Sequence, residues 1–381
     1  MSKLLSNIPR GMRYRLGAEA RLRRAIEETA MAVFDGWSYQ EIATPAVDYY
    51  ALFEHGMGRE QAELAFKFTD TDGRLLALRP DVTSSVARAA ATLFAGRARP
   101  LRLCYAAPVF RQTTQTLAEW RRESAQIGCE LIGAANTVAA EMEVIAIAVE
   151  ALRRLELAPD NRYCITLNHV GVFNGVAERL ALDDSARDHL RLLIDSRDTT
   201  ELQSFLAPYA TTDERERFAR LVQLSGKHET LAEARRLITN VRSAAALDRL
   251  AELWRIIESL NLTDYFEIDF GDVSGLDYYT GLTFKIYLSG AGVRVGGGGR
   301  YDNLTSNFGR AEPAVGFVLD LDALTDVLAR GKNFTKTLEQ NQAFAPVSET
   351  DPTTLFLAAT RKRARGERVL IELSEVARCR S

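Results

Sequence analysis

The order of strand-like and helix-like segments is the feature of this sequence that most constrains its fold. Short apolar segments with strand character lie on both sides of a long stretch, Gly171 to Leu260, in which Ala, Leu, Arg and Glu follow a helical period. Leu101 to Phe110 and Cys164 to His169 precede this stretch, and Tyr265 to Phe270 and Thr283 to Leu288 follow it. No regular alternation of strands with helices is visible, so we expect an α+β fold with a mainly antiparallel sheet flanked by helices, and a helical insertion at about residues 171–260.

Local signals predict further elements around this frame. Apolar periodicity predicts helices over Glu19 to Asp35, Asp81 to Phe94 and Glu141 to Arg154, and a further helix starting near Ala46. Thr71-Asp72-Gly73 between two apolar runs predicts a hairpin of strands 66–69 and 75–78. Another strand is expected over 129–132, after a long polar connection at 111–122.

The C-terminal part of the chain differs from the rest in composition and in its apolar pattern. We predict one core over residues 1–330, and a linker with a short C-terminal segment over 331–381. Leu355 to Ala358 and Val369 to Leu373 are interpreted as two short strands.

Charge and cysteine content exclude several function classes. The net charge is -3 and the pI about 6.0, which lacks the basic footprint of a protein that binds nucleic acid by phosphate neutralisation. The four cysteines form no CxxC pair and fit no zinc module, so we expect neither a metal nor another cofactor. No segment approaches the roughly 20 apolar residues of a membrane span, and we expect a soluble, cytoplasmic protein.

The segment Leu78-Arg79-Pro80-Asp81-Val82-Thr83 is the first candidate for a binding site. Pro80 can begin a helix, which places Asp81 and Thr83 in its first turn, where the helix dipole favours a carboxylate. Helix capping explains this pattern without a ligand. The functional interpretation is that Asp81 and Thr83 hold the amino group of a ligand.

A second candidate joins Arg111 to the segment that follows the long polar connection. Gln126, Gly128 and Glu130 alternate and therefore share one face of the predicted strand, beside Arg111 if the strands pair. Polar side chains directed at the middle of a sheet need partners. An internal salt bridge or a bound ligand would both supply them.

Two glycine-containing motifs complete the set. In Ser274-Gly275-Leu276-Asp277-Tyr278-Tyr279, the tyrosines can line a pocket for a small ring, or simply pack in the core beside a turn. The run Gly296 to Gly299 allows a ligand or another strand to approach the backbone closely.

Taken in order, these motifs resemble the histidyl-tRNA synthetase family of class II aminoacyl-tRNA synthetases from about Pro9 to Leu328. Segments 36–45, 110–133 and 313–324 resemble the three class motifs, the first of which lies at a homodimer interface. The Gly275 to Tyr279 and Gly298 to Asp302 segments resemble the two histidine-specific signatures. The resemblance implies a class II synthetase-like core and a set of histidine-binding residues, namely Asp81, Thr83, Arg111, Gln126, Glu130, Tyr278 and Tyr279.

The sequence departs from the synthetase pattern at positions that carry catalysis. Ser274 stands where the histidine signature has an arginine, and Ala323 stands where the third motif has the arginine that holds ATP. Gln112-Thr113-Thr114-Gln115 replaces a glutamate and arginine of the second motif. Each lost electrostatic donor at a transferring phosphate costs roughly 3 kcal/mol. We also expect no full anticodon-binding domain within residues 331–381.

This profile resembles the regulatory subunits of ATP phosphoribosyltransferase, which catalyses the first step of histidine biosynthesis. The resemblance implies a subunit without its own active site, which self-associates as a dimer and joins the short catalytic subunit in a hetero-octamer. It would activate that subunit and help to confer feedback inhibition by histidine, without binding tRNA. Two alternatives remain: a divergent enzyme that still activates histidine, using Arg121, Arg122 or Arg300 as substitute cations, and a structural partner whose pocket is a relic.

Overall fold

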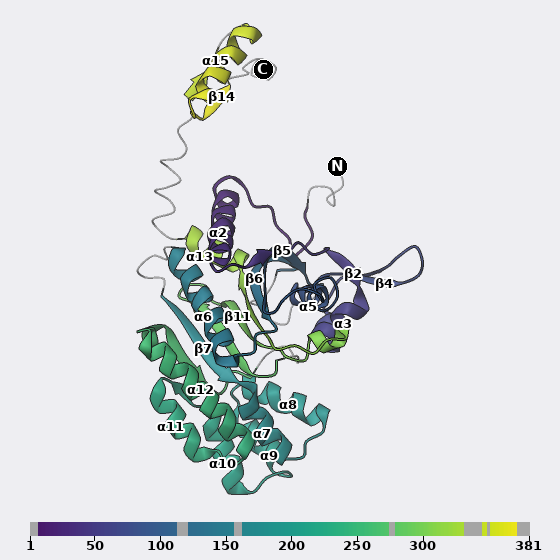
Figure 1. Cartoon of the computed structure of the whole chain (residues 1–381), viewed down its shortest axis with the longest axis vertical. Coiled ribbons are helices and arrows are strands. Elements are labelled where there is room, and N and C mark those ends of the chain that lie inside the picture. The colour runs from purple at the N-terminus through teal and green to yellow at the C-terminus, as the bar shows by residue number, and fades with distance from the viewer. Residues whose placement is uncertain are drawn as a thin grey trace. The chain divides into compact units, whose positions relative to one another are not determined.

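A computed structural model describes residues 7–112, 121–155, 162–273, 279–330, 345–348 and 351–371 (Figure 1). The chain divides into two compact units, Met1–Val327 and Leu328–Ser381. The predicted α+β class is confirmed, because a large, mainly antiparallel sheet with flanking helices forms the first unit.

Nine strands form the central sheet of the first unit. Their order across the sheet is β1 (Gln40–Glu41), β5 (Leu101–Phe110), β6 (Glu123–Ile132), β12 (Ala314–Asp320), β11 (Arg294–Arg300), β10 (Leu282–Leu288), β7 (Tyr163–His169), β9 (Phe266–Asp269) and β8 (Ser225–Gly226). Among the described strands of this sheet, only the β1–β5 and β7–β9 pairs are parallel. Because β6 pairs with β12, segments on either side of the helix-rich stretch become neighbours at the middle of the sheet.

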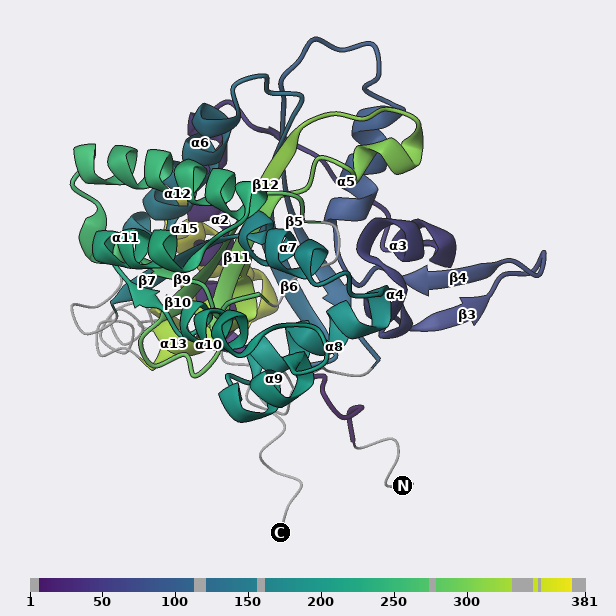
Figure 2. The same cartoon turned by 90° about the horizontal axis from the view of Figure 1, so that it is seen from below.

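The two faces of the sheet are covered by different helices (Figure 2). On β5, Leu103 and Tyr105 point to one face and pack against α5 (Thr83–Ala91). Arg102 points to the other face, where its guanidinium binds Glu143 of α6 (Thr137–Arg154) at 2.8 Å. Helix α2 (Gly17–Gly36) packs beside α6 on that second face. The alternation of side chains along β5 therefore separates the two layers.

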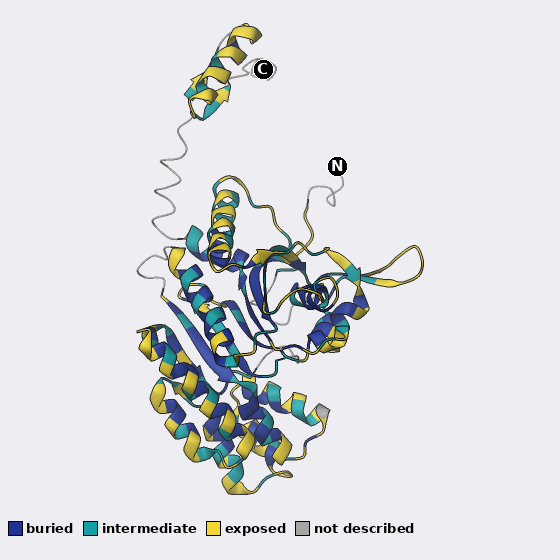
Figure 3. Cartoon of the chain, in the orientation of Figure 1, coloured by how far each residue is buried: buried dark blue, intermediate teal, exposed yellow. Residues whose placement is uncertain are grey.

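Helices make up most of the predicted insertion. They are α7 (Val170–Arg179), α8 (Asp184–Asp195), α9 (Thr199–Leu206), α10 (Thr212–Leu221), α11 (His228–Leu237) and α12 (Val241–Ser259). Their buried sides face one another and the sheet, and their outer sides are exposed (Figure 3). No strand is expected in this stretch from its sequence pattern, yet the two-residue strand β8 pairs with β9 at the sheet edge. A two-residue strand is too short to produce a period-two pattern.

A smaller sheet precedes α5. It consists of β2 (Val47–Tyr49), β4 (Leu75–Leu78) and β3 (Lys67–Thr69), with α3 (Tyr50–Met57) and α4 (Arg59–Glu63) between β2 and β3. The predicted hairpin is confirmed, and Gly73 occupies its turn with φ of 83°. The helix expected near Ala46 begins only at Tyr50, because residues 47–49 pair with β4.

The described residues 345–348 and 351–371 of the second unit form one helix and two strands. β13 (Ala345–Val347) pairs in parallel with β14 (Val369–Ile371), and α15 (Pro352–Ala364) connects them. The strand predicted over Leu355 to Ala358 was wrong, since these residues lie within α15. Asp351 caps this helix through the Thr354 N–H at 2.9 Å, and Pro352 follows at its first position. A four-residue apolar run does not distinguish the two structures by itself.

The glycine run lies in β11, where it lets neighbouring strands approach. A Cβ on Gly298 would lie 2.2 Å from the Gly316 carbonyl oxygen and 2.6 Å from the Phe317 side chain. The sequence allowed either a ligand or another strand to approach the glycine run. At Gly298 it is the neighbouring strand β12 that lies close to the backbone.

We expect Gly298→Ala to lower the free energy of unfolding by about 1–3 kcal/mol, since the added methyl group overpacks the β11–β12 contact. Gly36→Ala is the control, because its Cβ meets nothing within 4 Å. The control should be neutral or stabilising by up to about 1 kcal/mol. Urea unfolding measures both, and equal effects would contradict this account of the glycine run.

Candidate functional site

Glu130 lies at the centre of the candidate site, on β6. Its side chain is only 2% exposed, although a carboxylate in the middle of a sheet is normally unfavourable. Gly316 of β12 lies directly opposite, and a Cβ there would be 1.7 Å from Glu130 Oε2. The glycine therefore provides the space that the carboxylate occupies.

Three hydroxyl groups surround this carboxylate. Thr83 Oγ1 donates to Glu130 Oε1 at 2.9 Å, and the Tyr105 hydroxyl donates to the same oxygen at 3.1 Å. The Tyr301 hydroxyl donates to Oε2. Burial raises the pKa of Glu130 to about 7, and these three hydrogen bonds oppose the shift. Glu130 is thus poised to gain or lose a proton near neutral pH.

Asp81 is a second buried carboxylate of the same site. It is 6% exposed and lies just before α5, where the Ser84 hydroxyl donates to its Oδ2 at 3.1 Å. Its Oδ1 has no hydrogen-bond partner among the described residues. Burial raises the pKa of Asp81 to about 6, while Ser84 and the charge of Arg111 lower it. Asp81 in turn raises the pKa of Glu130, so the two carboxylates interact.

The remaining predicted residues border this pair to different extents. Gln126 is half-buried on the same face of β6 as Glu130, opposite Ala107 of β5. The Arg111 N–H donates to the Arg122 carbonyl at 2.8 Å, which extends the β5–β6 ladder beyond the strands. A Cβ on Gly299 would lie 2.9 Å from the Tyr279 ring, so this glycine makes room for the tyrosine. Tyr278 and Ser274 lie outside the described residues.

Sequence reasoning did not identify Ser84, Tyr105 and Tyr301 as parts of the site. Tyr301 directly follows the glycine run and Arg300, so it lay within a motif already selected. Tyr105 lies in a strand where an aromatic residue is typical of ordinary core packing. The Tyr105 hydroxyl reaches Glu130 only because Tyr105 of β5 pairs with Gly128 of β6.

Ala323 lies in α13 (Leu321–Ala329) beside a group of paired charges. Its N–H donates to Asp320 Oδ1 at 2.8 Å. Arg15 binds Asp322 at 2.7 Å, while Arg13 and Arg121 bind Asp326. These arginines are neutralised by carboxylates of the same chain.

The cations that a histidine-activating enzyme would need are engaged elsewhere. Arg121 binds Asp326, and the guanidinium of Arg122 lies 4.5 Å from the centre of the Phe66 ring. Arg300 binds Glu141 at 2.6 Å and Asp302 at 3.0 Å, away from solvent. The carboxylate pairings reduce the charge that Arg121 and Arg300 offer to a phosphate, whereas the ring contact holds Arg122 in place without reducing its charge.

The described residues contain no group of three or more His, Cys, Asp or Glu side chains arranged to hold a metal ion. No helix in the same ranges is both long and apolar enough to cross a membrane.

Comparisons with known proteins place this geometry in a family. The family model for histidyl-tRNA synthetase matches residues 11–324. An ATP phosphoribosyltransferase regulatory subunit from Moorella thermoacetica is 36% identical over 97% of this chain and 93% of the relative. The chain belongs to the family of ATP phosphoribosyltransferase regulatory subunits.

Further relatives agree with this assignment. The regulatory subunit from Symbiobacterium thermophilum is 38% identical over 84% of this chain and 79% of the relative. A crystal structure of an ATP phosphoribosyltransferase regulatory subunit/histidyl-tRNA synthetase from Bacillus halodurans has a TM-score of 0.85 at 30% identity, covering 99% of this chain and 96% of that one. The class II synthetase-like fold is confirmed, and so is the predicted resemblance to the regulatory subunits of ATP phosphoribosyltransferase.

Glu130→Gln should remove a pH dependence of stability. The pKa of Glu130 is about 7 in the folded protein against an ordinary 4.5, so the folded state binds the proton more tightly than the unfolded state. The free energy of unfolding should therefore fall as pH rises from about 4.5 to about 7, by roughly 2 kcal/mol more in the wild type than in the variant. Urea unfolding at pH 5, 6 and 8 measures this difference. Parallel pH profiles of the two proteins would contradict the assigned environment of Glu130.

Proposed function

We propose that this chain is a histidine-sensing regulatory subunit of ATP phosphoribosyltransferase, whose sensor is the site around Asp81 and Glu130. The observation that supports it best is the pair of interacting buried carboxylates, one of which keeps an unbonded oxygen, Asp81 Oδ1. Buried carboxylates without a salt-bridge partner are unfavourable unless a cation joins them. An amino-acid ammonium group supplies that cation.

Each part of a histidine molecule has a suitable partner in this proposal. The ammonium group binds Asp81, with Thr83 beside it, and the α-carboxylate binds Arg111, whose charge already acts on Asp81. The imidazole ring lies near Gln126, Glu130 and Tyr279, and Tyr278, outside the described residues, stays in the histidine-binding set by resemblance alone. Because Glu130 and imidazole have similar pKa values, a proton can be shared between them near neutral pH.

The proposed partner is the short catalytic subunit of ATP phosphoribosyltransferase, since the relatives are named as regulatory subunits of that enzyme. We propose that this chain forms a dimer and joins a cytoplasmic hetero-octamer that carries out the first step of histidine biosynthesis. In that assembly it activates the catalytic subunit and takes part in feedback inhibition by histidine. Binding of tRNA is not part of the proposal, in line with the net charge of -3.

Histidine should bind the isolated chain, and Asp81→Asn should weaken binding about tenfold or more, because it removes a charge-assisted hydrogen bond to the ammonium group. Isothermal titration calorimetry measures the affinity. Glu143→Gln is the matched control, since this carboxylate binds Arg102 on the opposite face of the sheet and should leave the affinity unchanged. Absence of binding to the wild type would leave the pocket as a relic and refute the sensor.

Mixing the chain with the short catalytic subunit should increase the rate of phosphoribosyl transfer to ATP and make it sensitive to histidine. Asp81→Asn should still co-purify with the partner and still activate it, but should shift histidine inhibition to about tenfold higher concentration or more, in proportion to the lost affinity. No change in rate or histidine sensitivity upon mixing would refute the regulatory role. Equal inhibition of both complexes would place the inhibitory site elsewhere.

A further inference from the structure

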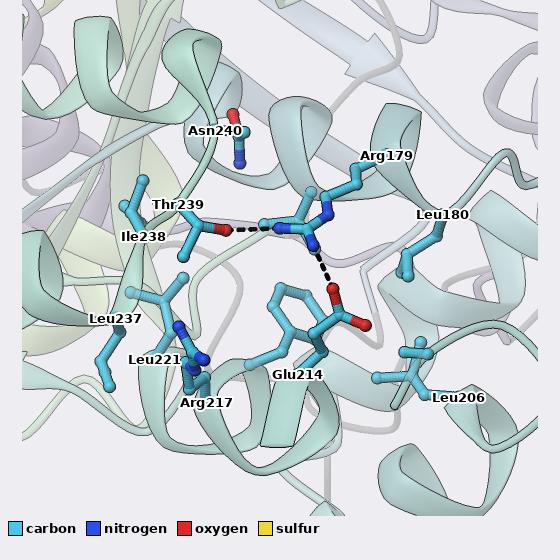
Figure 4. A pocket seen from close by; sticks show the side chains of 13 residues that line it. Arg179, Leu180, Leu206, Glu214, Arg217, Leu221, Leu237, Ile238, Thr239 and Asn240 are labelled. Atoms are coloured by element: carbon cyan, nitrogen blue, oxygen red, sulfur yellow. Dashed lines mark hydrogen bonds and ion pairs between the residues drawn. The ribbon is translucent and has the colours of Figure 1, made fainter. Parts of the chain in front are cut away.

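Arg300, the last residue of β11, and Glu141 of α6 form the most deeply buried ion pair among the described residues. Their side chains are only 6% and 1% exposed. By comparison, Arg179 and Glu214, which pair in the helical insertion, are 50% and 29% exposed (Figure 4). Surface pairs contribute little to stability, whereas a buried pair must be well bonded to offset the loss of water. Arg300 is therefore tolerated at this depth only with a full set of partners.

The Arg300 guanidinium joins α6, the turn after β11 and the start of β12. Its Nε donates to Glu141 Oε1 at 2.6 Å, and its Nη2 donates to the Thr137 carbonyl of the same helix at 3.1 Å. Its Nη1 donates to Asp302 Oδ1 at 3.0 Å. The same Asp302 oxygen accepts the N–H of Ala314, the first residue of β12, at 3.0 Å. Arg300, Glu141 and Asp302 thus form a clamp around the turn.

Tyr301 lies inside this clamp, between Arg300 and Asp302. Its N–H donates to the Ala314 carbonyl at 2.8 Å, and its buried ring packs in the core on the α5 side of the sheet. Its hydroxyl donates to Glu130. Successive side chains of an extended chain point to opposite faces, so fixing Arg300 on the α6 side fixes Tyr301 on the side of the candidate site.

The clamp also holds the chain next to Tyr279. The Thr280 N–H donates to the Arg300 carbonyl at 2.7 Å, and the Asp302 N–H donates to Thr280 Oγ1 at 3.0 Å. A Cβ on Gly281 would lie 2.8 Å from Arg300 Cδ, so this glycine leaves room for the arginine side chain. Two of the segments that border the candidate site therefore meet at Arg300.

We propose that Arg300 is a positioning residue of the candidate site, which holds Tyr301 where its hydroxyl donates to Glu130. It acts from the opposite face of the sheet, through Tyr301 and not through contact with a ligand. Where it concerns histidine affinity, this inference rests on the proposed function. Where it concerns the environment of Glu130 in the empty protein, it does not.

The proton on Glu130 distinguishes a positioning role from a purely structural one. Burial raises the pKa of Glu130, and among the three hydrogen bonds that lower it the one from Tyr301 has the largest effect. Asp81 raises the same pKa and is common to every variant below. Displacing the Tyr301 hydroxyl therefore raises the pKa of Glu130 further. An arginine that only packed α6 against the sheet would leave this pKa unchanged.

The test follows the free energy of unfolding of the full chain in urea between pH 5 and pH 9. Variants carry Glu141→Gln, because Arg300→Gln alone would leave a buried carboxylate without its cation and add a second titrating group. In this background, Tyr301→Phe should extend the fall of stability to higher pH by about 0.5–1 pH unit. Arg300→Gln should shift it in the same direction, and the two substitutions together should shift it no further than the larger of the two.

Removal of the Arg102–Glu143 pair, by Arg102→Gln with Glu143→Gln, is the matched control. It deletes another pair between a strand and α6 on the same face of the sheet, and should leave the pH profile unchanged. Asp302→Ala tests the same clamp at a side chain that is 40% exposed, should the Arg300 variant fail to fold. A wild-type profile in the Arg300 variant, or in Asp302→Ala where that variant replaces it, overturns the proposal.

Histidine affinity provides a second measurement by isothermal titration calorimetry. In the Glu141→Gln background, Arg300→Gln and Tyr301→Phe should each weaken histidine binding about threefold, and their effects should not multiply when combined. Multiplied effects would show that Arg300 acts independently of Tyr301 and would overturn the proposal. The pH profiles use no histidine. A wild type that binds no histidine would thus refute the sensor, while the profiles would still decide the role of Arg300.

Discussion

The burial of Glu130 in the middle of the sheet is the constraint on which the candidate site depends. A carboxylate at this depth is tolerated because Thr83, Tyr105 and Tyr301 each donate a hydroxyl hydrogen bond to it. Gly316 opposite it removes the side chain that would otherwise fill the space. These four residues come from a helix, two strands and a loop, so the arrangement exists only when the whole sheet has formed. The candidate site and the integrity of the fold are therefore linked through one side chain.

The second buried carboxylate, Asp81, makes the candidate site suited to binding a cation. Asp81 and Glu130 raise the free energy of the empty site chiefly because burial removes their carboxylates from water, and to a smaller extent because Asp81 acts on Glu130. In the proposed sensor, a cation bound between them offsets this cost, and its binding energy can then favour one conformation of the subunit over another. A protein used for sensing benefits from such a site, since the empty and occupied states differ in electrostatic energy.

The charges around α13, unlike the two buried carboxylates, are paired with opposite charges of the same chain. Arg13, Arg15 and Arg121 are matched by Glu19, Asp322 and Asp326, so positive charge near Ala323 is balanced within the chain. A nucleotide bound there would have to compete with these carboxylates. The same fold that supports catalysis in histidyl-tRNA synthetases is thus compatible here with a regulatory role, because function depends on the residues of the site and not on the fold.

The sequence by itself determined the class of the fold and most of its local elements. The hairpin at Gly73 and the helices of the insertion follow from turn chemistry and apolar periodicity, which act over a few residues. It also identified Asp81, Thr83 and Glu130, because polar residues in strand and helix-start patterns stand out. Tertiary structure decided the rest. Only the pairing of β5, β6 and β12 brings Tyr105, Glu130 and Gly316 together. Such contacts join residues far apart in the chain, and no local pattern records which of them will meet.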